Sequence, residues 1–271
     1  MNDERVNVDF FVVGSQRCGT TWIDKALRST GKISLPVNKQ AYFFDRNYDR
    51  GIEWYEKQFV SRDKKKYNLI GEVATGYCLD GAIDLLAKHY PEAKIILAVR
   101  EPVSRAYSNY VKRREEYGGM DFVAALSKNK DLVERGLYGE MLERILRFYS
   151  PEKVKVVFFD DLEKNSKRFY DEISEFLNID YEVDEKLFSQ NVNSSLFEGI
   201  SKLARKYKFY FLIKFIKKIG LTAQIRKLIY KLQKFKKKPA LLSSPNLHKV
   251  FHESNEVLGK LTKRDLSSWG K

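Results

Sequence analysis

Short apolar runs alternate with amphipathic segments through the first two thirds of the chain. Four runs are apolar almost throughout, as expected for strands covered on both faces; they span 8–13, 69–74, 94–99 and 154–159. Helical spacing occurs between and after them, at 21–30, 82–89, 102–116, 139–149 and 166–177. Because strands and helices alternate, the pattern predicts an α/β fold with a doubly wound parallel sheet of four to five strands.

The pattern changes after residue 191, where only helical spacing continues. We therefore predict a single domain over 1–271, with an α/β core at 8–180 and a helical C-terminal part at 191–271. Pro245 is expected to open the last helix, at 246–261. No apolar run approaches the ~18 residues that a membrane-spanning helix needs, and the polar N-terminus does not resemble a signal segment. A cytoplasmic location is therefore expected.

The net charge of +14 is concentrated in one segment. Residues 200–238 hold 14 of the 50 Lys and Arg and none of the 36 Asp and Glu, which leaves 36 basic against 36 acidic residues elsewhere. A neutral domain with one basic segment is not the pattern of a nucleic-acid-binding surface, so no nucleic-acid partner is expected. The amphipathic segment predicts helices that pack on the sheet, a groove for an anionic acceptor, or a peripheral membrane contact.

The first strand leads into a glycine-bounded loop at 14–22 (GSQRCGTTW) and then into a helix. A loop in this position directs backbone N–H groups at one point, with the positive end of the helix dipole behind it, which makes an anion site. Gly14 and Gly19 permit the turn and the close approach of a ligand, and Thr20 and Thr21 add hydroxyl donors. The alternative is a tight turn without a ligand.

This loop differs from the GxxxxGK[ST] phosphate loop of nucleotide triphosphatases. Thr20 stands where that motif has lysine, and the cation of the loop is Arg17. Glu72 lies at the carboxyl end of an apolar strand, and Arg100 and residues 160–161 directly follow two others, so we expect them near the loop, at the edge of the sheet where ligands bind. The three histidines and two cysteines are scattered, so no metal site is predicted.

Three segments together resemble the sulfotransferases that use 3′-phosphoadenosine-5′-phosphosulfate (PAPS). The loop at 14–22 resembles their 5′-phosphosulfate loop, and 100–110 (REPVSRAYSNY) resembles their 3′-phosphate segment. The stretch at 43–55 is typical of the carbohydrate (heparan-type) branch, to which the chain is most similar together with its bacterial relatives. Further similarity at 136–138, 156–162 and 251–269 extends the resemblance over nearly the whole chain.

The resemblance implies an enzyme of the EC 2.8.2 class that moves a sulfuryl group from PAPS to a hydroxyl or amine of a carbohydrate or small-molecule acceptor. No metal is implied, and PAP is the product. Arg17 would stabilise charge on the leaving phosphate, while Arg100 and Ser108 would hold the 3′-phosphate. The donor-binding residues that the resemblance implies are Gln16, Arg17, Cys18, Gly19, Thr20, Thr21, Trp22, Arg100, Ser108, Tyr138, Lys237 and Lys238.

The expected catalytic residues depart from the family pattern. The loop cation is usually lysine, and Arg17 remains charged but is a poor proton donor. The glutamate of the family's Lys-Glu-x-x-Phe-Phe segment is here Gln40, which cannot act as a base but can position an acceptor. Glu72 is the first candidate to replace that base and Asp45 the second; both can instead be structural carboxylates.

Two other functions stay open on the sequence alone. The stretch 156–160 (VVFFD) resembles a strand that ends in a magnesium-holding aspartate, which would suit a P-loop phosphotransferase that uses ATP and Mg²⁺. The absence of the kinase lysine at Thr20 counts against that function. The other is a non-enzymatic basic module that acts on acidic membranes or nucleic acid through 200–238. The sequence carries no signal for the identity of the acceptor or the oligomeric state.

Overall fold

The computed structural model of the chain describes residues 6–59, 67–79, 81–180, 183, 186–189 and 245–270. Within these residues, parallel strands form a five-stranded sheet in the order β2-β3-β1-β4-β5. The α/β class and the doubly wound parallel sheet of four to five strands are therefore confirmed. The strands are β1 (Phe10–Gly14), β2 (Ile33–Ser34), β3 (Leu69–Val73), β4 (Lys94–Val99) and β5 (Val154–Phe158).

Strand β1 lies at the centre of the sheet because its side chains are apolar on both faces. The residues from Phe10 to Val13 have no exposed surface. The register pairs Phe11 with Glu72 of β3 and shifts against β4 between Val12 and Gly14, where the chain leaves the sheet. This shift begins the loop that the sequence singled out.

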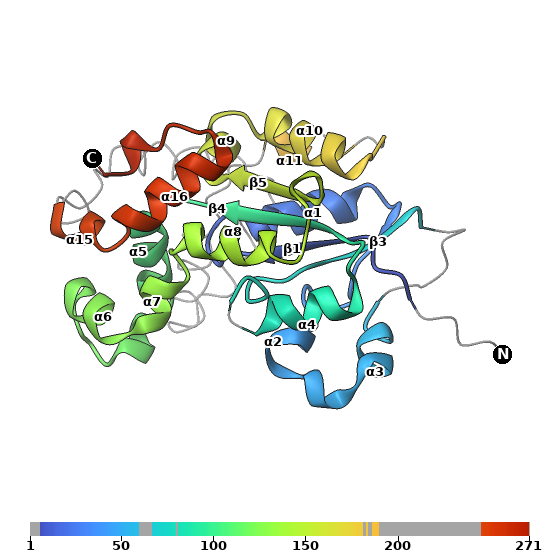
Figure 1. Ribbon diagram of the computed structural model, residues 1–271, viewed down its shortest axis with the longest axis horizontal. Coiled ribbons are helices and arrows are strands. Elements are labelled where there is room, and N and C mark those ends of the chain that lie inside the picture. Colours follow the sequence, from blue (N-terminus) through green and yellow to red (C-terminus); the bar gives the residue numbers. More distant parts are fainter. Residues whose placement is uncertain are drawn as a thin grey trace, which may run out of the picture.

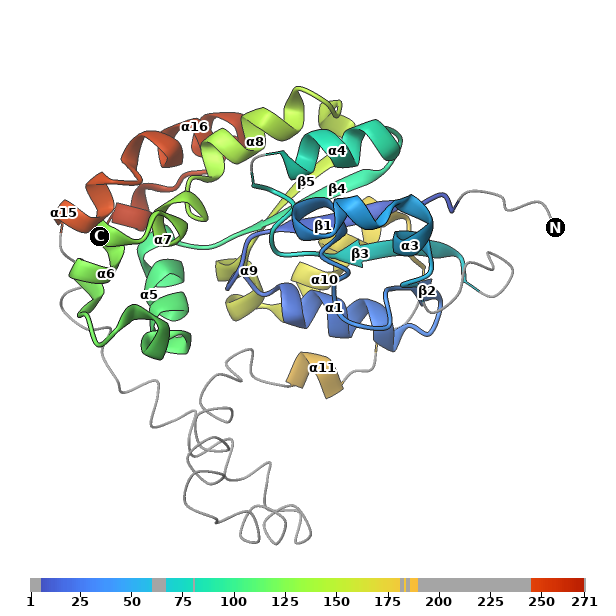
Figure 2. The same cartoon turned by 90° about the horizontal axis from the view of Figure 1, so that it is seen from below.

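Helices cover both faces of the sheet. Figure 2 shows α4 (Ala82–His89) and α8 (Tyr138–Leu146) on one side of the strands, and α1 (Thr20–Ser29) and α10 (Ser166–Leu177) on the other. The other α-helices of the described residues are α2 (Phe43–Arg46), α3 (Ile52–Glu56), α5 (Pro102–Lys112), α6 (Phe122–Lys128), α7 (Lys130–Glu134), α9 (Phe159–Lys164), α11 (Lys186–Ser189), α15 (Pro245–Lys249) and α16 (His252–Thr262). Short 3-10 turns are η1 (Tyr48–Arg50), η2 (Arg114–Tyr117), η3 (Pro151–Lys153) and η5 (Ser267–Gly270).

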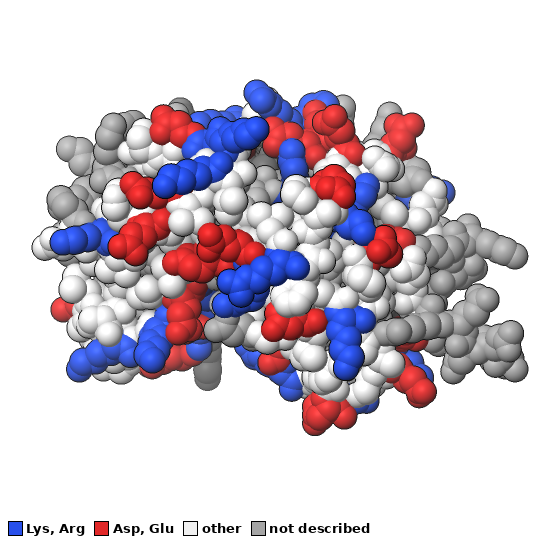
Figure 3. Space-filling model, viewed as in Figure 1, with Lys and Arg blue, Asp and Glu red and all other residues white. Residues whose placement is uncertain are grey.

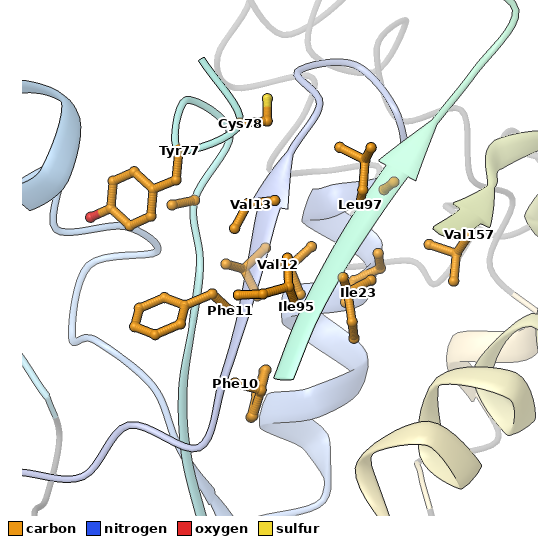
Figure 4. Close-up of a cluster of buried hydrophobic side chains, with 14 of the residues drawn as sticks. Phe10, Phe11, Val12, Val13, Ile23, Tyr77, Cys78, Ile95, Leu97 and Val157 are labelled. Atoms are coloured by element: carbon orange, nitrogen blue, oxygen red, sulfur yellow. The ribbon is translucent and has the colours of Figure 1, made fainter. Parts of the chain in front are cut away.

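The main core surrounds β1. Figure 4 shows the side chains of β1 together with Ile95 and Leu97 of β4 and Ile23 of α1. The ring of Phe11 lies 6.1 Å from that of Phe44 between centroids, in an edge-to-face arrangement. Phe43 and Phe44 are both buried and belong to this core. Through these rings the segment after β2 is attached to the centre of the sheet.

A second apolar cluster lies beyond the carboxyl ends of the strands. In Figure 1 the arrowheads of β4 and β5 point toward α5, which packs with α6 and α7. Val103 of α5 and Leu132 of α7 are fully buried there, and Phe251 from the C-terminal part completes the cluster. The helical C-terminal part is thus joined to the edge of the sheet where ligands bind in this class of fold.

Several element boundaries differ from the sequence prediction by one to a few residues, and two of them have a clear local context. The helix predicted at 102–116 ends at Lys112, and the 3-10 turn η2 follows it. The strand predicted at 154–159 ends one residue early, where helix α9 begins. Two acidic residues in the first turn of α9 favour this start, because negative charge stabilises a helix N-terminus.

The helix predicted at 246–261 is two helices, α15 and α16. The chain turns between them at Phe251, whose ring is fully buried. The basic segment 200–238 lies outside the described residues. No helix within the described residues has the length and apolar character needed to cross a bilayer. On the face drawn in Figure 3, acidic and basic side chains are interspersed, in keeping with the balanced charge outside the basic segment.

Candidate active site

The loop between β1 and α1, residues 14–20, has the geometry of an anion site. Gly19 has a φ of 86°, in the left-handed region that favours glycine, and a Cβ there would lie 2.8 Å from Leu162 Cδ2. No described side chain caps α1, so the N–H groups of Thr20 and Thr21 have no capping acceptor. The positive end of the helix dipole and these N–H groups together attract an anion.

Arg17, Arg100 and Ser108 meet beside this loop. Arg17 Nε donates a hydrogen bond to Ser108 Oγ at 2.9 Å, although the two residues are 91 positions apart. Arg100 Nη1 donates to the carbonyl oxygen of Arg17 at 3.4 Å, and its guanidinium carbon lies 4.3 Å from the centroid of the Phe159 ring. The β1–α1 loop, the end of β4 and helix α5 therefore form a cationic wall from the three residues that the sequence singled out.

Three other residues expected to bind the donor face the core. Cys18 and Tyr138 have no exposed surface, and Cys18 Sγ lies 3.5 Å from Tyr138 Oη. Burial raises the pKa of the Cys18 thiol and of the Tyr138 phenol. Trp22 packs its ring against Phe169, with 5.8 Å between centroids. These side chains support the loop from the core side, because a tight loop must also fill the space beneath it. Their burial leaves the backbone N–H groups of the loop to contact an anion, so their part in donor binding stays a prediction.

Lys39 lies at the same helix end, although the sequence did not single it out. Its Nζ donates to Thr21 Oγ1 at 3.0 Å and to Thr20 Oγ1 at 3.3 Å. Burial, with added repulsion from Lys112 and Arg17, lowers the pKa of Lys39 to about 8, although Asp24 acts in the opposite sense. A signal was present, since Lys39 is the first residue of the segment that matches the family's Lys-Glu-x-x-Phe-Phe. That motif does not reveal the direction of the side chain.

Gln40 points away from Lys39, toward the turn that follows β3. Its Oε1 accepts hydrogen bonds from the Thr75 N–H at 3.0 Å and from the Thr75 hydroxyl at 3.2 Å. Its Nε2 donates to Tyr42 Oη at 2.5 Å. Segment 39–45 is therefore held between the β1–α1 loop and the end of β3. Gln16, a half-buried residue of the β1–α1 loop, has an Oε1 with no hydrogen-bond partner among the described residues.

Glu72 is the buried anchor of segment 39–45. Its side chain has no exposed surface and accepts three kinds of hydrogen bond: from the Ala41 N–H at 2.6 Å, from Tyr55 Oη at 2.8 Å, and from Tyr77 Oη at 3.1 and 3.2 Å. Burial raises the pKa of Glu72 to about 7 despite these donors. A carboxylate enclosed in this way cannot reach an acceptor, which corrects the expectation that Glu72 is the first candidate for the base.

Asp45, the second candidate, has a more open carboxylate at the same edge. Its side chain is 16% exposed, and Oδ2 lies 3.8 Å from Arg46 Nε. Its Oδ1 is buried and has no hydrogen-bond partner among the described residues. The carboxylate stands over the backbone of Gly76, where a Cβ would overlap Oδ2. Burial raises the pKa of Asp45, which brings this carboxyl closer to the range in which a general base works.

Arg135 is a second residue that the sequence did not single out. Its Nη1 donates to the Thr75 carbonyl oxygen at 3.3 Å, and its own carbonyl oxygen accepts a hydrogen bond from Ser15 Oγ at 2.8 Å. Its Nε also donates to Asp131 Oδ1 at 2.5 Å. Arg135 thus joins the β1–α1 loop to the turn after β3. The signal for it was its place directly before 136–138, which resemble the family.

The acidic pair after β5 has partners within the protein. Asp161 is held by Arg264 through two parallel hydrogen bonds of 2.5 and 2.8 Å, and Asp160 Oδ2 accepts from the Trp269 indole at 2.9 Å. These contacts fix the C-terminal part and do not favour the magnesium role that a phosphotransferase would require. The described residues contain no group of three or more His, Cys, Asp or Glu placed to hold a metal. Lys237 and Lys238 lie outside the described residues.

Comparison with curated proteins gives two informative relatives. The chain is 35% identical over 106 residues to the membrane-associated sulfotransferase kil1 of Dictyostelium discoideum, covering 38% of this chain and 22% of that protein. It is 25% identical over 189 residues to heparan sulfate glucosamine 3-O-sulfotransferase 6 of Mus musculus, covering 66% of this chain and 55% of that protein. The matched part is thus little more than half the length of the second relative, and less than a quarter of the first.

Comparison with solved structures supports the fold. A sulfotransferase from Alicyclobacillus acidocaldarius superposes with a TM-score of 0.66 at 22% sequence identity, covering 98% of this chain and 99% of that one. The model of the sulfotransferase domain family matches residues 7–253. That match includes the β1–α1 loop, the end of β4 and segment 39–45. The chain therefore belongs to the sulfotransferase family, as its motifs predicted.

Proposed function

We propose that the chain is a PAPS-dependent sulfotransferase that transfers a sulfuryl group to a hydroxyl or amine of a carbohydrate or small-molecule acceptor. The observation that carries the proposal is the meeting of the uncapped end of α1 with Arg17, Arg100 and Ser108. Membership of the sulfotransferase family supports the class of reaction. No comparable observation favours phosphotransfer or a purely electrostatic binding module.

The residues at this edge fit the two anionic ends of PAPS. The N–H groups at the start of α1, the hydroxyls of Thr20 and Thr21, and Arg17 suit the 5′-phosphosulfate. Arg100 and Ser108 suit the 3′-phosphate, since a guanidinium can hold a phosphate through two parallel hydrogen bonds. PAPS supplies the sulfuryl group when it is bound. Arg17 then stabilises the charge that develops on the phosphate side.

Segment 39–45, across the site from the β1–α1 loop, supplies the group that activates the acceptor. Asp45 takes the proton of the acceptor hydroxyl or amine, because its side chain is 16% exposed whereas that of Glu72 is fully buried. Gln40 holds segment 39–45 against Thr75 by accepting its N–H, and buried Glu72 anchors the same segment by accepting the Ala41 N–H. In this assignment Asp45 does the chemistry expected of the family's glutamate, whereas Gln40 and Glu72 position it.

The class of acceptor is the finer part of the proposal. One relative is named for heparan sulfate glucosamine, which supports a carbohydrate acceptor for this chain as well. Small-molecule alcohols and amines are the other class, because acceptor pockets vary on a common scaffold. A cytoplasmic location and a peripheral membrane contact through 200–238 stay predictions.

Calorimetry with PAP tests the donor site. In buffer with EDTA, the protein is expected to bind PAP, and to bind adenosine 5′-phosphate at least about tenfold more weakly, because one charge-assisted phosphate contact is lost. Incubation with PAPS and a panel of desulfated heparan oligosaccharides, monosaccharides, simple alcohols and amines then identifies the acceptor class by PAP release. Tighter binding of ATP with Mg²⁺ than of PAP would overturn the proposal.

A further inference from the structure

Lys39 places a positive charge where the protein offers little to neutralise it. Its Nζ is bonded to the hydroxyls of Thr20 and Thr21, at the N-terminus of the ten-residue helix α1. A cation at this end of a helix opposes the positive end of the dipole, so the arrangement is unfavourable until an anion arrives. The hydroxyls of Thr20 and Thr21, which suit the phosphosulfate, thus also fix the position of the Lys39 ammonium.

The charges around Lys39 strengthen this conclusion. Asp24 of α1 is the acidic group that acts on it, and Asp24 is already engaged by Arg28, whose Nε lies 3.1 Å from Oδ1. Arg17 of the β1–α1 loop and Lys112 of α5 act in the opposite sense. Burial, the largest cause, combines with these two cations to lower the pKa of Lys39 to about 8. Near neutral pH this ammonium can both hold a proton and release it.

Arg17 cannot release a proton near neutral pH as Lys39 can. Its guanidinium stays protonated at any pH at which the protein is folded, and its Nε is committed to Ser108. The loop therefore supplies a fixed charge and no exchangeable proton. Lys39 reaches the same helix end from segment 39–45, next to Gln40.

We infer that Lys39 is the proton-donating cation of the donor site, a role that Arg17 at the loop position cannot fill. The inference rests on the proposed function. As the acceptor oxygen or nitrogen forms its bond to sulfur, the bond between sulfur and the phosphate oxygen breaks and leaves its electron pair on that oxygen. Lys39 Nζ gives a proton to this oxygen, the acceptor's proton passes to Asp45, and solvent restores both residues to their starting states.

Proton uptake on binding PAP tests the inference without any turnover. Binding of the anion raises the pKa of Lys39, so at pH 8 the wild type should take up about half a proton more than Lys39→Arg, whose guanidinium is always charged. Calorimetry in buffers of different ionisation enthalpy measures this number. Lys32→Met, an exposed lysine seven positions earlier in the chain, is the matched control and should behave as the wild type.

Hydrolysis of PAPS, with water as the acceptor, tests the chemical step. Lys39→Met and Lys39→Arg should each lower kcat/KM about 100-fold at pH 7, while Lys39→Arg keeps its affinity for PAP. In the wild type, kcat/KM should fall as pH rises through about 8, where free Lys39 loses its proton, and this limb should be absent in Lys39→Arg. When Arg17→Lys is added to Lys39→Met, kcat/KM for PAPS hydrolysis should rise at least tenfold, because the new lysine supplies an exchangeable proton at the loop.

The outcomes separate the two proposals. If Lys39→Arg hydrolyses PAPS and takes up protons as the wild type does, only the charge of Lys39 matters and the inference is overturned. If both Lys39 variants match Lys32→Met, Lys39 has no part in the site, although a wild type that binds PAP leaves the proposed function intact. A wild type that binds no PAP overturns the proposed function itself.

Discussion

The β1–α1 loop and segment 39–45 face each other across one site, yet they are built in different ways. The loop is formed by local chain geometry: a buried strand, Gly19 in the left-handed region, and a helix that starts without a cap. Segment 39–45 has little regular structure before α2, and side chains from other elements hold it in place. Glu72 of β3 accepts its Ala41 N–H, and Tyr77 donates to Glu72 and accepts from the Phe43 N–H.

This difference indicates which property of the site depends on the β1–α1 loop and which depends on segment 39–45. The loop depends on backbone N–H groups whose direction is set by the turn at Gly19, so its attraction for an anion is built into the local chain geometry. Segment 39–45 depends on a buried carboxylate and two tyrosine hydroxyls, so a change in any one of them moves the residues that face the acceptor. We therefore expect variants of the loop region to alter donor affinity, and variants of the segment to alter turnover.

The largest effect is expected from Asp45→Asn, which keeps the shape of the side chain but removes its ability to accept a proton. Turnover of PAPS with the identified acceptor should fall about 100-fold or more, the usual contribution of a general base. PAP affinity should be unchanged, since Asp45 of α2 packs on Gly76, in the turn after β3, and is not among the residues assigned to the phosphates. Because burial raises the pKa of Asp45, wild-type activity should rise with pH as this carboxylate forms.

Asp49→Asn, an exposed aspartate on η1, is the control for that variant. If Asp45→Asn and Asp49→Asn turn over PAPS equally well, the base lies elsewhere and the division of roles between the two regions fails.

An intermediate effect is expected from Glu72→Gln, on stability and its dependence on pH. The folded pKa of Glu72 is raised from 4.5 to about 7, so the native state binds its proton more tightly than the unfolded state. The wild type should therefore lose stability as pH rises from about 4.5 to about 7, by on the order of 3 kcal/mol. Glu72→Gln should lack this loss, apart from a smaller slope due to Asp45.

Urea unfolding at a series of pH values measures the effect, with Glu53→Gln, an exposed glutamate of α3, as control. Equal pH slopes in the wild type and in Glu72→Gln would show that Glu72 is not the titrating anchor of segment 39–45. PAP affinity measured on the same samples at pH 7 should stay close to the wild-type value, because the glutamine keeps an oxygen that can accept from the Ala41 N–H and so holds segment 39–45 in place.

The smallest effect is expected from Ser108→Ala. It removes the hydroxyl that accepts from Arg17 Nε at 2.9 Å and should weaken PAP binding about fivefold, the value of one net hydrogen bond. Binding of adenosine 5′-phosphate should change less, since Ser108 is assigned to the 3′-phosphate. Ser127→Ala, on the exposed side of α6, is the control. An equal loss for both nucleotides would place Ser108 on the 5′ side.

The sequence by itself determined the sheet and the β1–α1 loop. Both depend on contacts between neighbours in the chain: fully apolar strands, a glycine at the turn, and helical spacing directly after it. The meeting of Arg100 and Ser108 with the loop was also predictable, because carboxyl ends of parallel strands share one edge. The boundary errors, such as the division of the last helix at Phe251, arose where a buried side chain from another cluster ended the local pattern.

Only the tertiary structure decided the roles of the ionisable groups near the acceptor. Glu72 and Asp45 both follow the pattern of an acidic residue near the sheet edge, and nothing in the sequence shows that one is sealed by two tyrosines while the other keeps an oxygen without a partner. The direction of Lys39, toward Thr20 and Thr21, is likewise set by how segment 39–45 packs on the core. Burial and charge depend on all the chain that surrounds a residue, and a linear pattern does not contain that information.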